Sequence, residues 1–239
     1  MAVGVVSDIH GNLEALQSVL DECSNRDIDE FVCLGDVVGY GADPAACVEL
    51  IREKAAFTCA GNHDWAASGR IDTSNFNPMA AEAIRWTKEQ LSDSDSEYLD
   101  SLTLAHRTGS ALFVHGSPYE PEAFLYIFSS FDATAALEAT DARLTFVGHS
   151  HRAFVCVEGE GEAVSGEGEC SLAGGRALVN VGSVGQPRDG DPRAAFGVWD
   201  QDAQTIELVR VPYDGDTAQQ KILDAGLPDF LARRLSGGR

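Results

Sequence analysis

The chain has 239 residues and a formal net charge of −21 at pH 7, with 38 acidic residues against 17 basic ones. This balance argues against stable nucleic-acid binding, which depends on neutralising phosphates with lysine and arginine. No apolar run approaches the roughly 20 residues that a membrane span needs, and no basic leader precedes the first apolar run. We therefore expect a cytoplasmic protein with no membrane partner.

The acidic composition also suggests the salt concentration in which the protein works. Among the basic residues only Lys54, Lys88 and Lys221 are lysines. An acidic, lysine-poor surface suits molar salt, in which a Debye length of about 3 Å screens self-repulsion. We expect a halophilic source, and the alternative is an unusually soluble protein from an ordinary environment.

The first sixty residues alternate predicted strands and helices. Short apolar runs predict strands at residues 3–6, 31–34 and 57–60. Apolar residues at helical spacing follow Asn12, a suitable helix cap, and a second helix is expected from Pro44 to about Lys54. This alternation predicts parallel strands with right-handed crossovers.

The middle of the chain contains a predicted helical excursion at about residues 77–102, opened by Pro78 and interrupted at 92–96. It lies between two strands that carry polar clusters, so it is placed to cap a site. The expected elements that follow are strands at 102–106, 111–115 and 144–147 and a helix near 132–139.

The last third contains short alternating segments at 154–158, 177–181, 194–199 and 205–209, which predict an antiparallel or mixed sheet. The Gly-, Glu- and Ser-rich stretch at about 158–175 is predicted to be an exposed, flexible acidic loop. Residues 217–235 predict one or two helices interrupted at Pro228. We expect one domain over residues 1–239 with two packed sheets.

Five of the six histidines fall in short clusters of Asp, Asn, Gly and His, each preceded by a predicted strand. The clusters are Asp8-Ile9-His10, Gly35-Asp36, Gly61-Asn62-His63-Asp64, His115-Gly116 and Gly148-His149-Ser150-His151. Residues at the ends of successive strands converge on one edge of a sheet, so the pattern predicts a site built from five loops. In each of the pairs Asp8/His10 and His149/His151, one residue separates the two members. Alternate residues of an extended segment point the same way, so both members of each pair are expected to face one site.

The clusters offer mixed oxygen and nitrogen donors, which suit Mn, Fe, Zn, Ni or Co. The candidate ligands are Asp8, His10, Asp36, Asn62, His115, His149 and His151. Seven ligands with one bridging carboxylate serve two ions, and two ions about 3.5–4 Å apart can clamp a phosphoryl oxygen and supply a bridging hydroxide as nucleophile. Any one triplet arises readily by chance, but five in order do not. His106 belongs to no cluster and receives no role.

These blocks resemble the signature of the calcineurin-like metallophosphoesterase superfamily: D-x-H, G-D, G-N-H-[DE], H and G-H-x-H. The resemblance implies an α/β fold, a four-layer αββα sandwich of two mixed β-sheets flanked by helices. It also implies that residues matching Asp8, His10, Asp36 and His151 hold one ion and that those matching Asp36, Asn62, His115 and His149 hold the other. By the same resemblance His63 approaches the leaving group or phosphate, oriented by Asp64.

A second resemblance lies outside these blocks. Residues 180–190 and the Gly39-Tyr40-Gly41 element are similar to the small prokaryotic branch that includes YfcE-type phosphodiesterases. Within this loop Arg188 is placed either to grip a phosphate bidentately or to pair with Asp189 or Asp191. Tyr40 either lines the pocket or packs in the core.

Together these features predict a phosphoesterase that hydrolyses small phosphodiesters or phosphomonoesters with two divalent ions, most simply manganese. One alternative is a non-catalytic scaffold, since a retromer subunit has this fold with a degraded site; the complete ligand set and His63 favour an enzyme. Another is a nucleotide or dinucleoside-polyphosphate hydrolase. The acidic charge argues against a nuclease acting on long DNA. Assembly into a homo-oligomer is left open.

Overall fold

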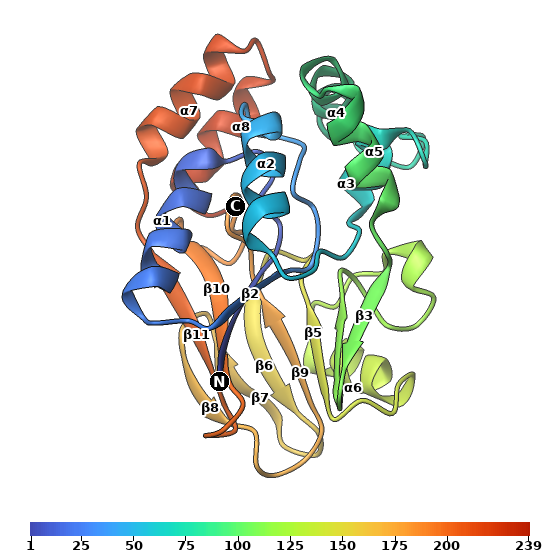
Figure 1. Cartoon of the computed structure of the whole chain (residues 1–239), viewed down its shortest axis with the longest axis vertical. Coiled ribbons are helices and arrows are strands. Elements are labelled where there is room, and N and C mark those ends of the chain that lie inside the picture. The colour runs from blue at the N-terminus through green and yellow to red at the C-terminus, as the bar shows by residue number, and fades with distance from the viewer.

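The computed structural model describes residues 1–239 and contains two β-sheets with helices on their outer faces (Figure 1). The strands are β1 (Ala2–Val6), β2 (Glu30–Cys33), β3 (Ala105–Thr108), β4 (Ala111–Val114), β5 (Leu144–Val147), β6 (Ala153–Val157), β7 (Gly161–Ser165), β8 (Gly168–Ser171), β9 (Ala177–Val181), β10 (Ala194–Asp200) and β11 (Thr205–Val211). The α-helices are α1 (Leu13–Asn25), α2 (Pro44–Lys54), α3 (Asn62–Ser68), α4 (Pro78–Gln90), α5 (Asp93–Ser101), α6 (Ser130–Glu138), α7 (Gly215–Asp224) and α8 (Asp229–Arg233). Two 3-10 turns, Pro121–Ala123 and Leu235–Gly237, complete the structure.

Both sheets mix parallel and antiparallel pairs. The first has the order β2-β1-β10-β11-β8, in which β1 runs parallel to β2 and antiparallel to β10. The second has the order β3-β4-β5-β9-β6-β7, with β4, β5 and β9 parallel to one another. The predicted two mixed sheets are therefore confirmed.

The core is divided by the sheets into layers, as strand periodicity requires when both faces of a sheet are covered. Along β1, Val3 and Val5 belong to the apolar cluster between the two sheets, whereas Val6 packs in the cluster that includes α1 and α2. On the far side, α6 covers the second sheet through residues such as Leu137. Helix, sheet, sheet and helix form the four predicted layers.

The helix starts follow local chemistry. Asn12 caps α1 by accepting from the Ala15 N–H at 3.1 Å, and Pro44 occupies the first turn of α2, as predicted. The predicted break at 92–96 is wrong in extent, because Ser92 forms a capping box with Asp95 and α5 begins at Asp93. The polar residues 92–96 are therefore mostly the first turn of a helix and not a loop.

Two predicted strands differ in the structure. Residues 57–60 form no full strand, since Thr58 pairs only with Cys33 and Cys59 only with Thr103, one bridge on each side. The strand predicted at 102–106 begins later, at Ala105, because α5 continues to Ser101 and uses Leu102 as its C-cap.

The segment 158–175 was predicted to be a flexible loop, and this is wrong in part. Most of its side chains are exposed, but it contains β7, which pairs with β6 at the edge of the second sheet, and β8, which pairs with β11 at the edge of the first. Edge strands gain their hydrogen bonds from the backbone of a neighbour, so a polar sequence can form them without burying side chains.

The C-terminal helices α7 and α8 are separated near Pro228, as predicted, and α7 packs against both α1 and α8 (Figure 1). None of the helices combines the length and apolarity that a membrane span requires.

Candidate metal centre

Four strands end at the same place, two from each sheet. Asp8 and His10 follow β1, Asp36 follows β2, His115 follows β4, and His149 and His151 follow β5. Asn62, His63 and Asp64 lie in the first turn of α3 beside them. The junction of the two sheets thus collects the five clusters that the sequence analysis singled out.

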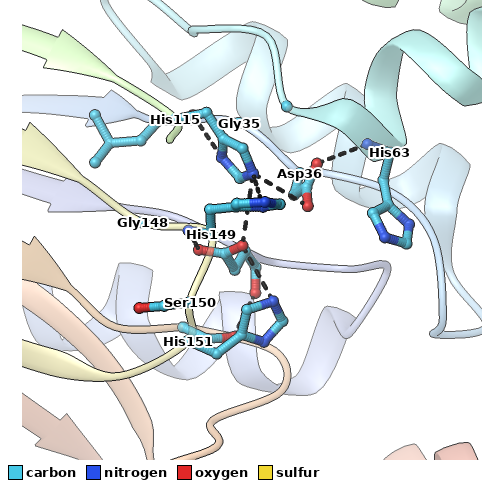
Figure 2. A network of polar contacts seen from close by, with 12 residues as sticks. Gly35, Asp36, His63, His115, Gly148, His149, Ser150 and His151 are labelled. Atoms are coloured by element: carbon cyan, nitrogen blue, oxygen red, sulfur yellow. Dashed lines mark hydrogen bonds and ion pairs between the residues drawn. The ribbon is translucent and has the colours of Figure 1, made fainter. Parts of the chain in front are cut away.

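Three groups of side chains are close enough for one ion each to be held by their ligand atoms. They are Asp8, His10 and His151; His10, Asp36 and His63; and Asp36, His115 and His149. All seven residues are buried. Figure 2 shows His115, His149 and His151 in a column with Asp36 beside it, while the ring of His63 stands apart.

Asp36 lies between the two halves of this centre. Its Oδ2 is 3.3 Å from Nε2 of His115 and 3.6 Å from Nε2 of His10. On the other side, Oδ1 of Asp8 is 3.2 Å from Nε2 of His151. The remaining carboxylate oxygens accept backbone N–H groups, from His63 to Asp36 at 2.8 Å and from His149 to Asp8 at 2.9 Å, which fixes both carboxylates in place.

Three of the imidazoles are oriented by backbone carbonyls. Nδ1 of His10 donates to Val38 O at 3.0 Å, Nδ1 of His115 to Leu34 O at 3.1 Å, and Nδ1 of His151 to Gln186 O at 2.6 Å. A carbonyl can only accept, so each Nδ1 carries a proton, and Nε2 is the atom that a neutral ring leaves free for a metal. Burial opposes a charge on His115, but the carboxylate of Asp36 raises its pKa to about 9, so a bound cation would replace the proton on its Nε2. Such outer hydrogen bonds are the usual support of metal-bound histidines.

The ring nitrogens that make no bond to the backbone face one another. Nε2 of His10 lies 3.1 Å from Nε2 of His151, and Nε2 of His115 lies 3.1 Å from Nδ1 of His149. Burial and the neighbouring His115 lower the pKa of His149 to about 3, so its ring is neutral at pH 7. Asp8 Oδ1 and Asn62 Oδ1 are also buried without a hydrogen-bond partner. Ring nitrogens and free oxygens aimed at common points fit the coordination of divalent cations.

The loops reach this arrangement through an unusual backbone, not the extended one that was predicted. Asp8, His10, Asp36, His149 and His151 all have positive φ, between 51° and 64°. The side chains of Asp8 and His10, and those of His149 and His151, therefore converge because the backbone turns in the left-handed region. They do not converge because alternate residues of a strand share a face. Each such residue costs of the order of 1–3 kcal/mol, and strain of this kind clusters at functional sites.

His63 is buried next to the centre but is held by packing. Its ring lies 4.5 Å from the Tyr40 ring and 5.0 Å from the Phe76 ring, and its Nδ1 has no hydrogen-bond partner. A Cβ at Gly39 would collide with this ring, so glycine is required there. Burial lowers the pKa of His63 to about 4 despite the attraction of Asp36.

Asp64 makes no hydrogen bond to the ring of His63, whose Nδ1 has no partner, so these contacts do not support the predicted orienting role. Its two oxygens accept four backbone N–H groups, from Asp36, Val37, Val38 and Gly61, at 2.8–3.3 Å. Asp64 therefore fixes the loop that carries Asp36 and the entry to α3.

Arg188 and Tyr40 lie together above the centre. The Arg188 guanidinium is 5.6 Å from the centre of the Tyr40 ring and donates to Gln186 Oε1 at 2.8 Å. The predicted alternative, pairing with a neighbouring acid, is wrong, because Asp189 pairs with Arg210 and Asp191 with Arg193. Tyr40 satisfies both of its predicted alternatives, since it is buried and lines the adjoining cleft.

A cleft of about 740 Å³ opens beside His63 and His149. Its lining includes Phe76, Phe124 and Tyr126, none of which the sequence analysis assigned. The predicted cap at 77–102 contributes only in part: Asn77 and Ala80 line the cleft, whereas α5 does not. The neighbouring lining residues precede the predicted cap and are Ile71, Asp72, Ser74, Asn75 and Phe76. The available signal for Tyr126 was the apolar run 124–128, in which aromatic residues stand at every second position although the run forms no strand.

Comparisons with known proteins agree with this geometry. A family model described as a calcineurin-like phosphoesterase superfamily domain matches residues 1–204. The chain is 42% identical over 242 residues to an uncharacterized protein of Methanocaldococcus jannaschii, covering 99% of this chain and 98% of that one. The crystal structure of a metallophosphoesterase from Sphaerobacter thermophilus is similar, with a TM-score of 0.91, 39% identity and coverage of 100% and 99% of the two chains. A hypothetical protein from Pyrococcus horikoshii shares the fold, with a TM-score of 0.83, 19% identity and coverage of 100% and 98%.

Proposed function

Because this chain belongs to the calcineurin-like phosphoesterase superfamily, we propose that it hydrolyses small phosphodiesters or phosphomonoesters with the help of two divalent metal ions. The observation that carries the proposal is the position of Asp36, whose Oδ2 is within 3.6 Å of imidazole nitrogens on both sides. A carboxylate oxygen between two sets of ligands is suited to bridge two cations.

The ligands divide naturally around this oxygen. Asp8, His10, Asp36 and His151 would hold one ion, and Asp36, Asn62, His115 and His149 the other. The two pairs of facing nitrogens and the two partnerless oxygens support this division. Manganese is the metal we expect, and Fe, Co, Ni or Zn suit the same donors.

When bound, the two ions would supply Lewis acidity to the phosphoryl group and lower the pKa of water from 15.7 to about 7. The protein's own residues would do the rest. His63, next to the ligands but held by packing, would donate a hydrogen bond or proton to the departing oxygen. Arg188, which has no carboxylate partner, would bind phosphate oxygens in a bidentate manner, with the Tyr40 ring beneath it.

We also propose a cytoplasmic, halophilic setting. The net charge of −21 and the scarcity of lysine support high salt. All six cysteines are free, which suits a reducing compartment.

The test is hydrolysis after metal removal. Chelated protein in high KCl is re-supplied with Mn, Fe, Co, Ni or Zn and assayed on bis-p-nitrophenyl phosphate and on p-nitrophenyl phosphate. We expect activity to return with at least one metal, and the ratio of the two rates to show whether diesters or monoesters are preferred. Absence of activity with every metal, on these substrates and on dinucleoside polyphosphates, would favour a non-catalytic scaffold.

A further inference from the structure

The cleft beside the metal centre is much larger than a phosphate group needs. Its volume of about 740 Å³ falls in the range of pockets that enclose whole organic ligands. His63, Asn62 and His149 form its inner end, where the reacting phosphate would lie. The outer part is therefore available to the organic group that the phosphate carries.

Aromatic side chains from two separate segments form the walls of this outer part. Phe76 precedes α4, while Phe124 and Tyr126 lie between β4 and α6. Tyr126 is 48% exposed, and its ring is held in place by stacking on His149, with 3.8 Å between centroids and 12° between planes. Tyr126 also stacks on Phe128, with 5.0 Å between centroids and 14° between planes, so its ring is held by both neighbours. Its exposed edge is suited to contact the face of a planar ring, since aromatic rings also pair edge to face.

The same walls carry hydrogen-bonding groups that an alkyl chain or lipid tail would leave unpaired. Asp72, Asn75, Asn77 and Glu122 line the cleft. One oxygen of Asp72 accepts from Ser74 N and that of Asn77 from Ala80 N, but Asn75 and Glu122 make no hydrogen bond within the protein. Carboxylates accept N–H donors such as those on the edge of a nucleobase, and they repel further phosphate groups.

We propose that the outer cleft binds the nucleoside group of a phosphodiester substrate, with the base against Phe76 and Tyr126 and its polar edge toward Asp72, Asn75 and Glu122. This inference rests on the proposed function, which supplies the reacting phosphate at the inner end. It adds the class of substrate: a nucleotide ester in preference to an ester of a small aliphatic alcohol.

The experiment keeps the leaving group constant and changes the other arm of the diester. Rates are compared for p-nitrophenyl thymidine 5′-phosphate and ethyl p-nitrophenyl phosphate on metal-loaded protein. We expect a lower KM for the thymidine ester. Phe76→Leu and Tyr126→Ala should each raise that KM by about 5- to 100-fold, the range for loss of one base–aromatic contact, while the KM of the ethyl ester stays within about twofold. Because Phe76 packs on His63 and Tyr126 on His149, any fall in kcat should be the same for both esters.

Phe131→Ala is the matched control. Phe131 is 81% exposed and lies outside the cleft lining, so its removal should change neither substrate. Phe76→Leu keeps an apolar side chain and so preserves the fold. Since Tyr126 stacks on His149, bound metal is measured in each variant, and the effect must appear at unchanged metal content.

Equal KM values for the two esters in the wild-type protein, or variants that shift both esters alike, would overturn the inference while leaving the phosphoesterase intact. Failure of the proposed function would instead abolish hydrolysis of both esters with every metal. In that case calorimetric titration with thymidine 5′-monophosphate decides: binding that Phe76→Leu weakens supports the nucleoside cleft, and absence of binding refutes it.

Discussion

The floor and the wall of the cleft are built in opposite ways. The floor, our name for the seven candidate ligands at the inner end of the cleft, lies at four strand ends and at the start of α3, and Asn62 and His149 are its members that line the cleft. Its carboxylates and three of its imidazoles are each fixed through a second atom by the backbone. The wall, formed by Phe76, Phe124 and Tyr126, comes from segments outside the sheets, and its outer part is exposed to solvent. Reaction chemistry and substrate choice are therefore separable in this molecule, because a loop can change while the scaffold under it stays the same.

The largest effect on activity is expected from replacing Asp36, the carboxylate between the two groups of candidate ligands. Asp36→Asn keeps the shape but removes the charge between the two ligand groups. Loss of several kcal/mol of Lewis-acid stabilisation corresponds to a fall in kcat/KM of about 10³-fold or more. Metal content by mass spectrometry should fall in parallel. Asp93→Asn, at an exposed position on α5, is the matched control and should retain both. Full activity in Asp36→Asn would contradict the bridging assignment.

His63→Ala tests whether His63 acts at the leaving group or is a metal ligand. We expect kcat to fall by about 10²–10⁴-fold on substrates with poor leaving groups, as for loss of a general acid, while bound metal is unchanged. The comparison is His106→Ala, because His106 is exposed and stacks only on Phe57. If His63→Ala loses its metal, the residue belongs to the floor as a ligand, and the proposed role at the leaving group is wrong.

Asp64→Asn tests whether Asp64 holds the loop that carries Asp36 or instead orients the ring of His63. An amide NH₂ facing backbone N–H donors leaves at least one of them unpaired, which costs about 1–3 kcal/mol and lowers the Tm by several degrees. Metal affinity should fall by about 10- to 100-fold, as for loss of an outer-sphere partner. A lower kcat at unchanged metal affinity would instead favour the orienting role that the motif implied.

The smallest effect is expected on thermal stability, from screening of the negative charge on the protein surface. Raising KCl from 0.1 to 2 M should increase the Tm by about 5 °C, roughly 1–2 kcal/mol for a chain of this size, because salt screens repulsion among exposed carboxylates. Thermal unfolding followed by circular dichroism measures this. Sucrose, which strengthens burial without screening charge, is the control. A Tm that stays constant or falls in KCl would argue against a halophilic protein.

Much of the floor was predictable because its residues are both chemically distinctive and placed directly after apolar strands. Asp8, Asp36 and His115 meet in space for the reason that their positions in the sequence suggested. The left-handed backbone and the partners of Asp64 were not predictable, since both depend on where the loop after β2 lies relative to α3.

The wall could not be predicted for a different reason. An aromatic residue outside the strands and helices, such as Phe76 or Tyr126, has the same local sequence whether it packs in a core or faces a cleft. The edge strands β7 and β8 escaped prediction in a similar way, because their pairing depends on β6 and β11 and not on their own polar sequence.

The position of β1 has a consequence for how the protein is made. β1 is an inner strand whose antiparallel neighbour is β10, so Val3 pairs with Trp199 across almost the whole sequence. Contacts of such long separation form late in folding, and during synthesis they must wait for the distant partner to leave the ribosome. Asp8 and His10 directly follow β1, so the nascent chain cannot close the metal centre until β10 has been translated. We therefore expect metal to be acquired by the finished chain and not during its synthesis.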